Sequence, residues 1–233
     1  MKKAFIKNII AMIIAAFIAI STTIITLTYV FKKTGTDPES ATAIGVNFFR
    51  YYTSDSNILV AIISTIIFVY CLQNIIKKKD EMPLWLIVLF LVGVTGTTVT
   101  FLTTTFFLSP ISAAMGNGYF TLFAGYLFFL HFLNPVLALV LILVLLNYHR
   151  LNWKHALMCA ITVVIYSFIY TPCVLTNTWP DFYGFTFGGK LWLAPLSLLA
   201  MYGVGIGLGF ILVLLHNLTI KRSLATESCA NSN

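Results

Sequence analysis

Long apolar runs alternate with short polar connections along the whole chain. Six of these runs are roughly 20 residues or longer and occupy residues 8–31, 55–76, 84–108, 125–147, 155–174 and 193–217. A helix rises 1.5 Å per residue, so about 20 residues cross the ~30 Å hydrocarbon core of a bilayer. Transmembrane barrels instead show short alternating segments. The continuous runs therefore predict an all-α, polytopic membrane helix bundle with six transmembrane helices.

The composition agrees with this prediction. The chain has 233 residues, of which 59% are hydrophobic and 9% are charged, whereas soluble domains contain about 25% charged residues. The six runs leave no room for a separate soluble domain. We expect residues 1–220 to form one membrane domain and the polar residues 221–233 to form a disordered cytoplasmic tail.

The net charge of +7 reflects orientation in a membrane. The basic residues form short clusters between the apolar runs, which is typical of membrane proteins and argues against a nucleic-acid partner. If the N-terminus is cytoplasmic, ten basic residues lie on the inner side and four on the outer side, as the positive-inside rule requires. This count predicts a cell-membrane protein with both termini in the cytoplasm. The outer four are Lys32, Lys33, Arg50 and Lys190.

Polar side chains in the apolar runs gather at the predicted outer face. The second run begins with Thr53, Asp55, Ser56 and Asn57. A short polar side chain often caps a helix by accepting hydrogen bonds from its first amides, so capping accounts for one member of this cluster. The remaining members exceed what a cap needs. Because polar groups at membrane depth are costly, they indicate a site.

His131 is the one histidine that the pattern places inside an apolar run. Asn134 and Pro135 follow at helical spacing, which predicts that His131 and Asn134 share a face and that the helix kinks at Pro135. Histidine acts as a base or an acid near neutral pH, and it activates a neighbouring hydroxyl as a nucleophile. The alternative is a histidine that makes one interhelical hydrogen bond.

The lengths of the helices leave open which hydroxyl lies beside His131. Thr53 precedes Lys77 by about 36 Å of helix, and His131 precedes His149 by about 27 Å. Straight parallel helices would place Thr53 about 9 Å nearer the outer surface than His131. Ser56 and Asn57, which follow Thr53 in the helix, match the depth of His131 better. Helix tilt and a kink at Pro135 can absorb part of this difference.

Two segments resemble a known family. They are 48-FFRYYTSDSNILVA-61 at the start of the second run and 130-LHFLNPVLAL-139 in the fourth, with a weaker third segment, 179-WPDFYGFTFGG-189. In order and spacing they are similar to the androgen-induced-gene membrane proteins of animals, which include the androgen-dependent TFPI-regulating protein, and to their six-span bacterial relatives. This resemblance implies an intramembrane hydrolase with a threonine nucleophile and a histidine.

On the matching positions, the resemblance implies Thr53 as nucleophile and His131 as base, acting on a hydrophobic ester among membrane lipids. Acyl transfer also needs a donor for the oxyanion, and Asn57 or Asn134 is a candidate, with Ser56 as a supporting residue. Asp55 and Asp181 are candidates to orient the histidine. No cofactor is implied, and no His/Cys cluster suggests a metal. The competing hypotheses are a non-catalytic binder of a lipid or small molecule and a structural membrane subunit.

Overall fold

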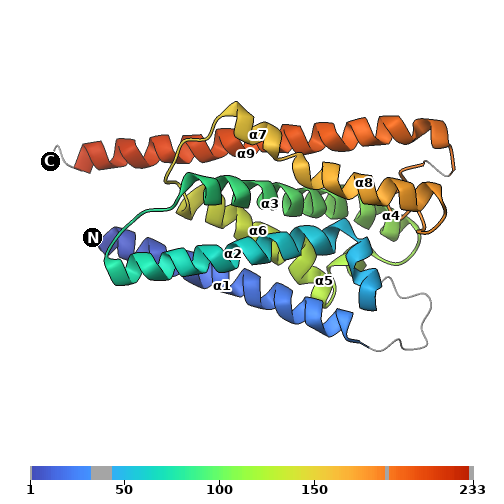
Figure 1. Cartoon of the computed structure of the whole chain (residues 1–233), viewed down its shortest axis with the longest axis horizontal. Coiled ribbons are helices and arrows are strands. Elements are labelled where there is room, and N and C mark those ends of the chain that lie inside the picture. The colour runs from blue at the N-terminus through green and yellow to red at the C-terminus, as the bar shows by residue number, and fades with distance from the viewer. Residues whose placement is uncertain (1, 33–43, 187–188, 231–233) are drawn as a thin grey trace.

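The computed structural model describes residues 2–32, 44–186 and 189–230, which form a bundle of long helices running side by side (Figure 1). The α-helices are α1 (Lys2–Val30), α2 (Tyr52–Lys77), α3 (Leu84–Thr103), α4 (Ser109–Ala114), α5 (Tyr126–Phe128), α6 (Asn134–Val140), α7 (Trp153–Met158), α8 (Ile161–Leu175) and α9 (Ala194–Ala230). Short 3₁₀ segments are η1 (Gly45–Arg50), η3 (Tyr119–Phe123) and η6 (Leu191–Leu193), and π-helical segments are η2 (Thr104–Leu108), η4 (Phe129–Leu133) and η5 (Leu141–Leu145).

Six helical stretches in the described residues are long and apolar enough to cross a membrane, which confirms the predicted number. We call them spans 1 to 6 in chain order: Ala4–Val30, Tyr52–Lys77, Leu84–Ala114, Tyr126–Leu145, Trp153–Leu175 and Ala194–Lys221. Their centres match the predicted runs, while span 3 is longer because π-helical and α-helical turns continue it to Ala114. Helix α9 runs on to Ala230, past residue 220, where the predicted membrane domain ends. The disordered tail stays a prediction, and residues 231–233 lie outside the described part.

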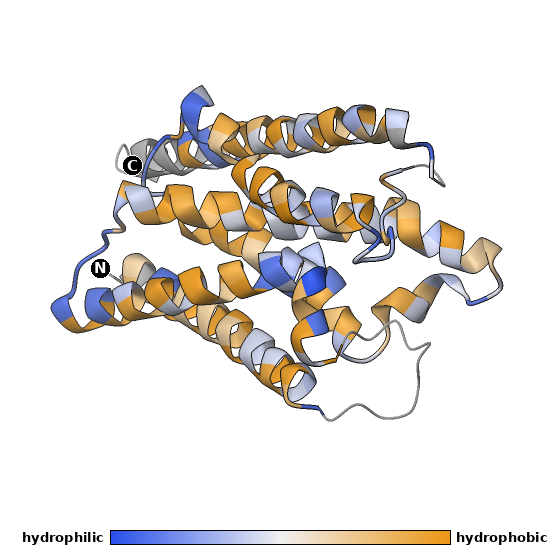
Figure 2. Cartoon of the chain, turned by 45° about the vertical axis from the view of Figure 1, so that its right-hand side comes forward, coloured by the Kyte–Doolittle hydropathy of each residue, from blue (hydrophilic) through white to orange (hydrophobic). Residues whose placement is uncertain are grey.

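The start of α1 and the end of α9 lie at the same end of the bundle, on the left of Figure 1. Hydrophilic residues are concentrated toward the two ends of the bundle, and the helices between them are largely hydrophobic (Figure 2). This distribution is the one that a membrane requires. Which end faces the cytoplasm stays a prediction.

Helix α3 is the central element of the bundle. In its most hydrophobic stretch 72% of the residues are buried, more than in any other span. Close contact with α2 is possible because Gly93 and Gly96 lack side chains: a Cβ on Gly93 would lie 2.9 Å from Val60. Four threonines of α3 hydrogen-bond to backbone carbonyls of their own helix, which is a common arrangement for hydroxyls inside apolar helices. These threonines are Thr95, Thr97, Thr98 and Thr100.

Span 4 is the least regular span, because two π-helical turns interrupt it. The first, η4, contains His131 and ends directly before Pro135. In this turn the amide of Asn134 bonds five residues back, to Phe129. At the same spacing Pro135 would bond to Leu130, but proline has no N–H to donate. The predicted distortion at Pro135 is therefore present as a π-turn that leaves the Leu130 carbonyl available to another helix.

Candidate functional site

Thr53 and His131, the two residues that the resemblance singles out, line one cavity at the end of the bundle opposite to the start of α1. This cavity, which we call the histidine cavity, has a volume of about 360 Å3. Thr53 is the second residue of α2, and His131 lies in η4 of span 4. The bundle thus brings two segments that are far apart in the sequence to the lining of one cavity. Within residues 2–32, 44–186 and 189–230, no hydrogen bond joins the Thr53 hydroxyl to His131.

The imidazole of His131 is buried and held in one orientation. Its Nδ1 lies 2.6 Å from the carbonyl oxygen of Leu122. Because a carbonyl only accepts hydrogen bonds, Nδ1 carries the proton and Nε2 is left with a lone pair. An imidazole fixed in this tautomer has the arrangement of a general base, since the unprotonated nitrogen is the one that takes a proton.

Thr53 also borders a second cavity, which we call the apolar cavity. It has a volume of about 420 Å3 and lies between α2, the second half of span 3, and spans 5 and 6. Thr53, Leu108 and Tyr183 line both cavities. Most of its accessible lining is hydrocarbon, from side chains such as Val99, Leu108, Val163 and Met201. Thr53 therefore stands between an apolar space and a histidine.

Ser56, whose depth matches that of His131 better than the depth of Thr53 does, lies elsewhere. Its hydroxyl is within 3.2 Å of the Thr53 carbonyl oxygen and 3.3 Å of the Thr100 hydroxyl on α3. It lines a different, smaller cavity between α2 and α8. The depth estimate assumes straight parallel helices, and the π-turn in span 4 breaks that assumption.

The two amides that the sequence suggests as oxyanion donors are committed to helix packing. Asn57 donates one N–H to the Thr53 carbonyl at 2.8 Å and the other to the Leu130 carbonyl at 3.0 Å. It thereby satisfies the carbonyl that Pro135 leaves without a partner. Asn134 is fully buried and bonds to Thr22 and Ser21 of α1.

The prediction that His131 and Asn134 share a face is wrong, because the π-turn η4 lies at this point of span 4. A π-turn has more residues per turn than an α-helix, so residues three apart no longer line up. His131 is directed to the histidine cavity, and Asn134 to α1. The π-turn η4 and the helix α6 that follows it thus face different parts of the bundle.

The predicted side-chain cap of α2 is also wrong. The N-cap residue is Tyr51, and it makes no side-chain cap hydrogen bond. Instead, the amide N–H of Tyr52 donates to the hydroxyl of Tyr183, 3.1 Å away in the loop between α8 and α9. A phenol from a distant loop thus satisfies one of the amides that a helix start leaves unpaired.

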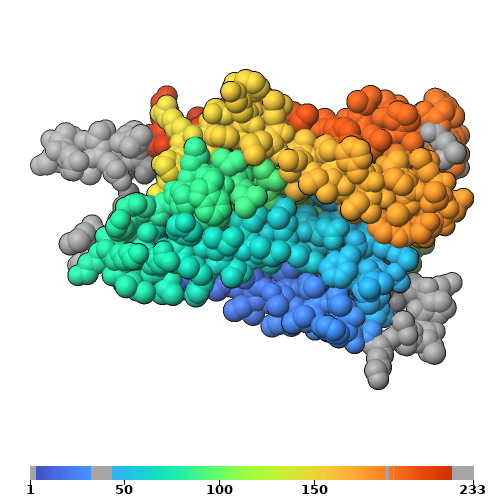
Figure 3. Space-filling model, in the orientation of Figure 1, coloured from blue at the N-terminus to red at the C-terminus, as the bar shows by residue number. Residues whose placement is uncertain are grey.

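Neither acid is placed to orient His131. Asp55 lines the small cavity between α2 and α8, next to Tyr52 and Tyr166, and Figure 3 shows these two helices side by side on the molecular surface. The Asp181 carboxylate accepts hydrogen bonds from its own loop, from Phe185 and Thr186, and from Tyr170. The guanidinium of Arg50 lies over the ring of Trp179. In the described part of the chain, no three metal-binding side chains come together.

Asp181 is expected to make the loop sensitive to acid. Burial raises the pKa of Asp181, but its hydrogen bonds from Thr186, Tyr170 and Phe185 outweigh burial and lower the pKa below the usual value. A depressed folded-state pKa contributes stability above the unfolded pKa of about 3.9, and this stability is lost as pH falls through the folded value. We expect Asp181→Asn to lower the free energy of unfolding at pH 7 by about 1–2 kcal/mol.

Thermal unfolding of the two proteins in detergent at pH 7 and pH 3 checks this prediction. The gap between the wild type and Asp181→Asn should be smaller at pH 3 than at pH 7. Glu81→Gln is a matched control, because Glu81 is an exposed acid at the other end of the bundle. A gap that stays the same at both pH values would contradict the prediction.

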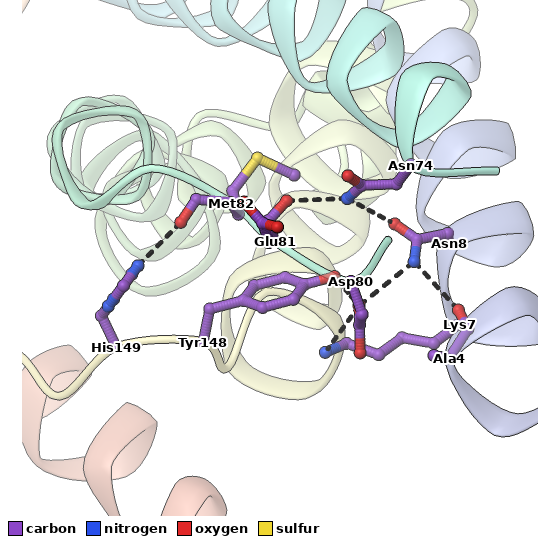
Figure 4. Close-up of polar contacts among 9 residues, drawn as sticks. All are labelled: Ala4, Lys7, Asn8, Asn74, Asp80, Glu81, Met82, Tyr148 and His149. Carbon is purple, nitrogen blue, oxygen red and sulfur yellow. Dashed lines mark hydrogen bonds and ion pairs between the residues drawn. The ribbon is translucent and has the colours of Figure 1, made fainter. Parts of the chain in front are cut away.

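The sequence analysis missed a polar network at the opposite end of the bundle. Asn74 of α2 donates to Asn8 of α1 at 3.2 Å, and Asn8 donates to Asp80, which also accepts from Tyr148 (Figure 4). These contacts tie α1 and α2 to the two connections at this end. The sequence does hold an indication of this network, because Asn8 and Asn74 lie within otherwise apolar runs.

His216 belongs to the same end and was also missed. It is fully buried, and its two nitrogens lie 2.9 Å from the Ile142 carbonyl and 3.0 Å from the His149 carbonyl. Its imidazole therefore joins α9 to the second π-turn of span 4. His131 is thus not the only histidine buried within the bundle.

The fold defines an all-helical, multi-pass membrane protein with two adjoining cavities at one end. Searches among protein-family models, curated proteins and solved structures found no match to this chain.

Proposed function

We propose that this protein is an intramembrane hydrolase of lipid esters, with Thr53 as nucleophile and His131 as general base near the outer leaflet. The observation that carries the proposal is that Thr53 and His131 line one cavity, with the free nitrogen of the imidazole set by the Leu122 carbonyl. A hydroxyl and a fixed base in one cavity are the minimal components of acyl transfer.

The apolar cavity supports a hydrophobic substrate. Thr53 borders it, so an ester bond at Thr53 leaves about 420 Å3 for hydrocarbon on the far side of the nucleophile. The partner is then a membrane lipid. The distribution of basic residues supports the cell membrane as the location, with both termini in the cytoplasm and the site on the outer side.

The reaction follows the usual course of nucleophilic acyl transfer. Thr53 Oγ1 attacks the ester carbonyl carbon while its proton moves to Nε2 of His131. The intermediate collapses, the C–O bond to the alcohol breaks, and the imidazolium returns the proton to the departing alkoxide. Water then attacks the acyl-threonine with the same base and releases the fatty acid.

A long-chain alkyl fluorophosphonate tests the proposal. The purified protein in nanodiscs should form a covalent adduct in which Thr53 Oγ1 has displaced fluoride from phosphorus, detected by intact-mass and peptide mass spectrometry. Thr53→Ala should abolish the adduct. Ser56→Ala is the matched control and should keep it, because Ser56 bonds to Thr100 outside the histidine cavity. An unlabelled wild-type protein, or an adduct that persists in Thr53→Ala, would overturn the proposal.

A second function is favoured by one specific observation. In the part of the chain that the structure describes, the Thr53 hydroxyl makes no hydrogen bond to His131, although the two cavities are present. A lipid or small molecule bound without chemistry would need only the cavities. In that case the alkyl fluorophosphonate would occupy the cavities without forming a covalent adduct.

A further inference from the structure

Tyr183 occupies the boundary between the two cavities. It comes from the loop between α8 and α9, and it lines both the histidine cavity and the apolar cavity together with Thr53. Its hydroxyl oxygen lies 3.1 Å from the amide nitrogen of Tyr52, the residue directly before Thr53. The phenol hydroxyl is therefore next to the backbone that carries the proposed nucleophile.

The hydroxyl of Tyr183 still has a proton to donate. A phenol oxygen accepts with its lone pairs and donates its one hydrogen. The bond from Tyr52 uses a lone pair. The Tyr166 hydroxyl also interacts with the Tyr183 hydroxyl and gives its own hydrogen to the Arg50 carbonyl, so an oxyanion would replace Tyr166 as the partner of the Tyr183 hydrogen. Burial raises the pKa of Tyr183 above its usual value, so the phenol stays protonated at neutral pH. A neutral donor thus adjoins both cavities.

The loop holds Tyr183 in place through a chain of hydrogen bonds. The backbone N–H of Tyr183 donates to the Tyr170 hydroxyl at 3.2 Å, and that hydroxyl donates to the Asp181 carboxylate at 2.8 Å. The same carboxylate accepts the amides of Phe185 and Thr186. An oxyanion donor acts best when it is fixed before the reaction, because no reorganisation is then required in the transition state.

We infer that Tyr183 is a catalytic residue of the proposed hydrolase, and that its hydroxyl donates a hydrogen bond to the oxyanion formed when Thr53 attacks an ester. This inference rests on the proposed function. It assigns the role that the sequence analysis gave to Asn57 or Asn134, both of which are bonded elsewhere. It also gives Asp181 a purpose, as a positioning residue that acts through Tyr170.

The step balances without any further reactant. As Thr53 Oγ1 bonds to the carbonyl carbon, the C=O electron pair moves to oxygen, and the Thr53 proton moves to His131. The negative oxygen accepts the Tyr183 hydrogen bond, and the phenol keeps its proton throughout. When the intermediate collapses, the electron pair returns to the carbonyl, the alkoxide leaves, and His131 returns the proton to it.

The rate of labelling by a long-chain alkyl fluorophosphonate tests the inference, because its phosphoryl oxygen takes the place of the oxyanion. We expect Tyr183→Phe to slow formation of the Thr53 adduct by about 10²–10³-fold, the usual loss for one such donor. The matched control is Tyr119→Phe, which removes a phenol hydroxyl that donates to the Thr105 carbonyl and lines neither of the two cavities. It should be labelled at the wild-type rate.

A second variant separates catalysis from the structural bond to Tyr52. Replacing Tyr183 with 2,3-difluorotyrosine keeps the hydroxyl in place but makes the phenol more acidic. Its labelling rate should fall at a lower pH than that of the wild type, because a phenolate cannot donate to an oxyanion. A purely structural role would leave this pH profile unmoved.

The two proposals fail in different ways. If wild-type Thr53 is labelled and both Tyr183 variants match its rate and pH profile, the inference about Tyr183 is overturned while the proposed function stands. If wild-type Thr53 is not labelled, the proposed function is overturned and the inference falls with it.

Discussion

Replacing His131 with asparagine is expected to lower the rate of lipid-ester hydrolysis by about 10²–10⁴-fold, the range for loss of a general base. The amide nitrogen of asparagine can replace Nδ1 as donor to the Leu122 carbonyl, so the wall of the histidine cavity should keep its contacts. The amide cannot take a proton from Thr53. Release of fatty acid from a fluorogenic long-chain ester, measured with purified protein in nanodiscs, gives the rate.

The comparison with His131→Ala adds a structural measurement. Alanine also removes the hydrogen bond to Leu122, so it should lower the unfolding temperature while asparagine leaves that temperature close to the wild type. If His131 were only a packing residue, asparagine would keep the activity as well as the stability. Unchanged hydrolysis in both His131→Ala and Thr53→Ala would rule out the proposed mechanism.

Gly209→Ala is expected to be the most damaging small change in the bundle. An added Cβ would overlap the carbonyl oxygen of Ala156 and lie 2.7 Å from Cβ of Cys159. Backbone atoms cannot turn aside as a flexible side chain does, so α9 would have to move away from α7 and the start of α8. We expect a loss of about 3 kcal/mol, the upper end of the usual range for overpacking.

The matched control lies two residues away in the same helix. A Cβ on Gly207 would meet no atom within 4 Å, so Gly207→Ala should be neutral or slightly stabilising, since alanine favours a helix over glycine. The midpoint of thermal exposure of the buried thiols Cys71 and Cys159 to a fluorogenic maleimide reports both effects. Equal midpoints for the two variants would contradict this account of packing. Of the four glycines of span 6, Gly205 and Gly209 approach neighbouring atoms closely, whereas Gly203 and Gly207 meet no neighbour within 4 Å.

The spans could be predicted because a bilayer imposes a length and a polarity that each segment must satisfy by itself. The bonds of the α3 threonines to their own helix were predictable for the same reason, since they depend only on nearby backbone. The placement of Thr53 and His131 toward one end also follows from where each lies along its own run.

Features that depend on partners far away in the sequence could not be predicted. The cap of α2 comes from Tyr183, and the roles of Asn57 and Asn134 depend on a π-turn that their own segments do not reveal. Asn57 appeared to be an oxyanion donor because its type was suitable, while its two N–H groups are used by carbonyls. The position of His216 near the last basic residues of its run gives no sign of its contact with span 4.

The π-turn at η4 has a consequence for how this molecule can change over evolution. Such a turn is equivalent to one extra residue inserted into an α-helix, and each residue of an α-helix rotates the chain by about 100°. A single inserted or deleted codon near Phe129–Leu133 would therefore rotate His131 around the helix axis while the rest of span 4, from Asn134 onward, kept its neighbours. Descendants of this chain could gain or lose the histidine cavity in one mutational step without losing the bundle.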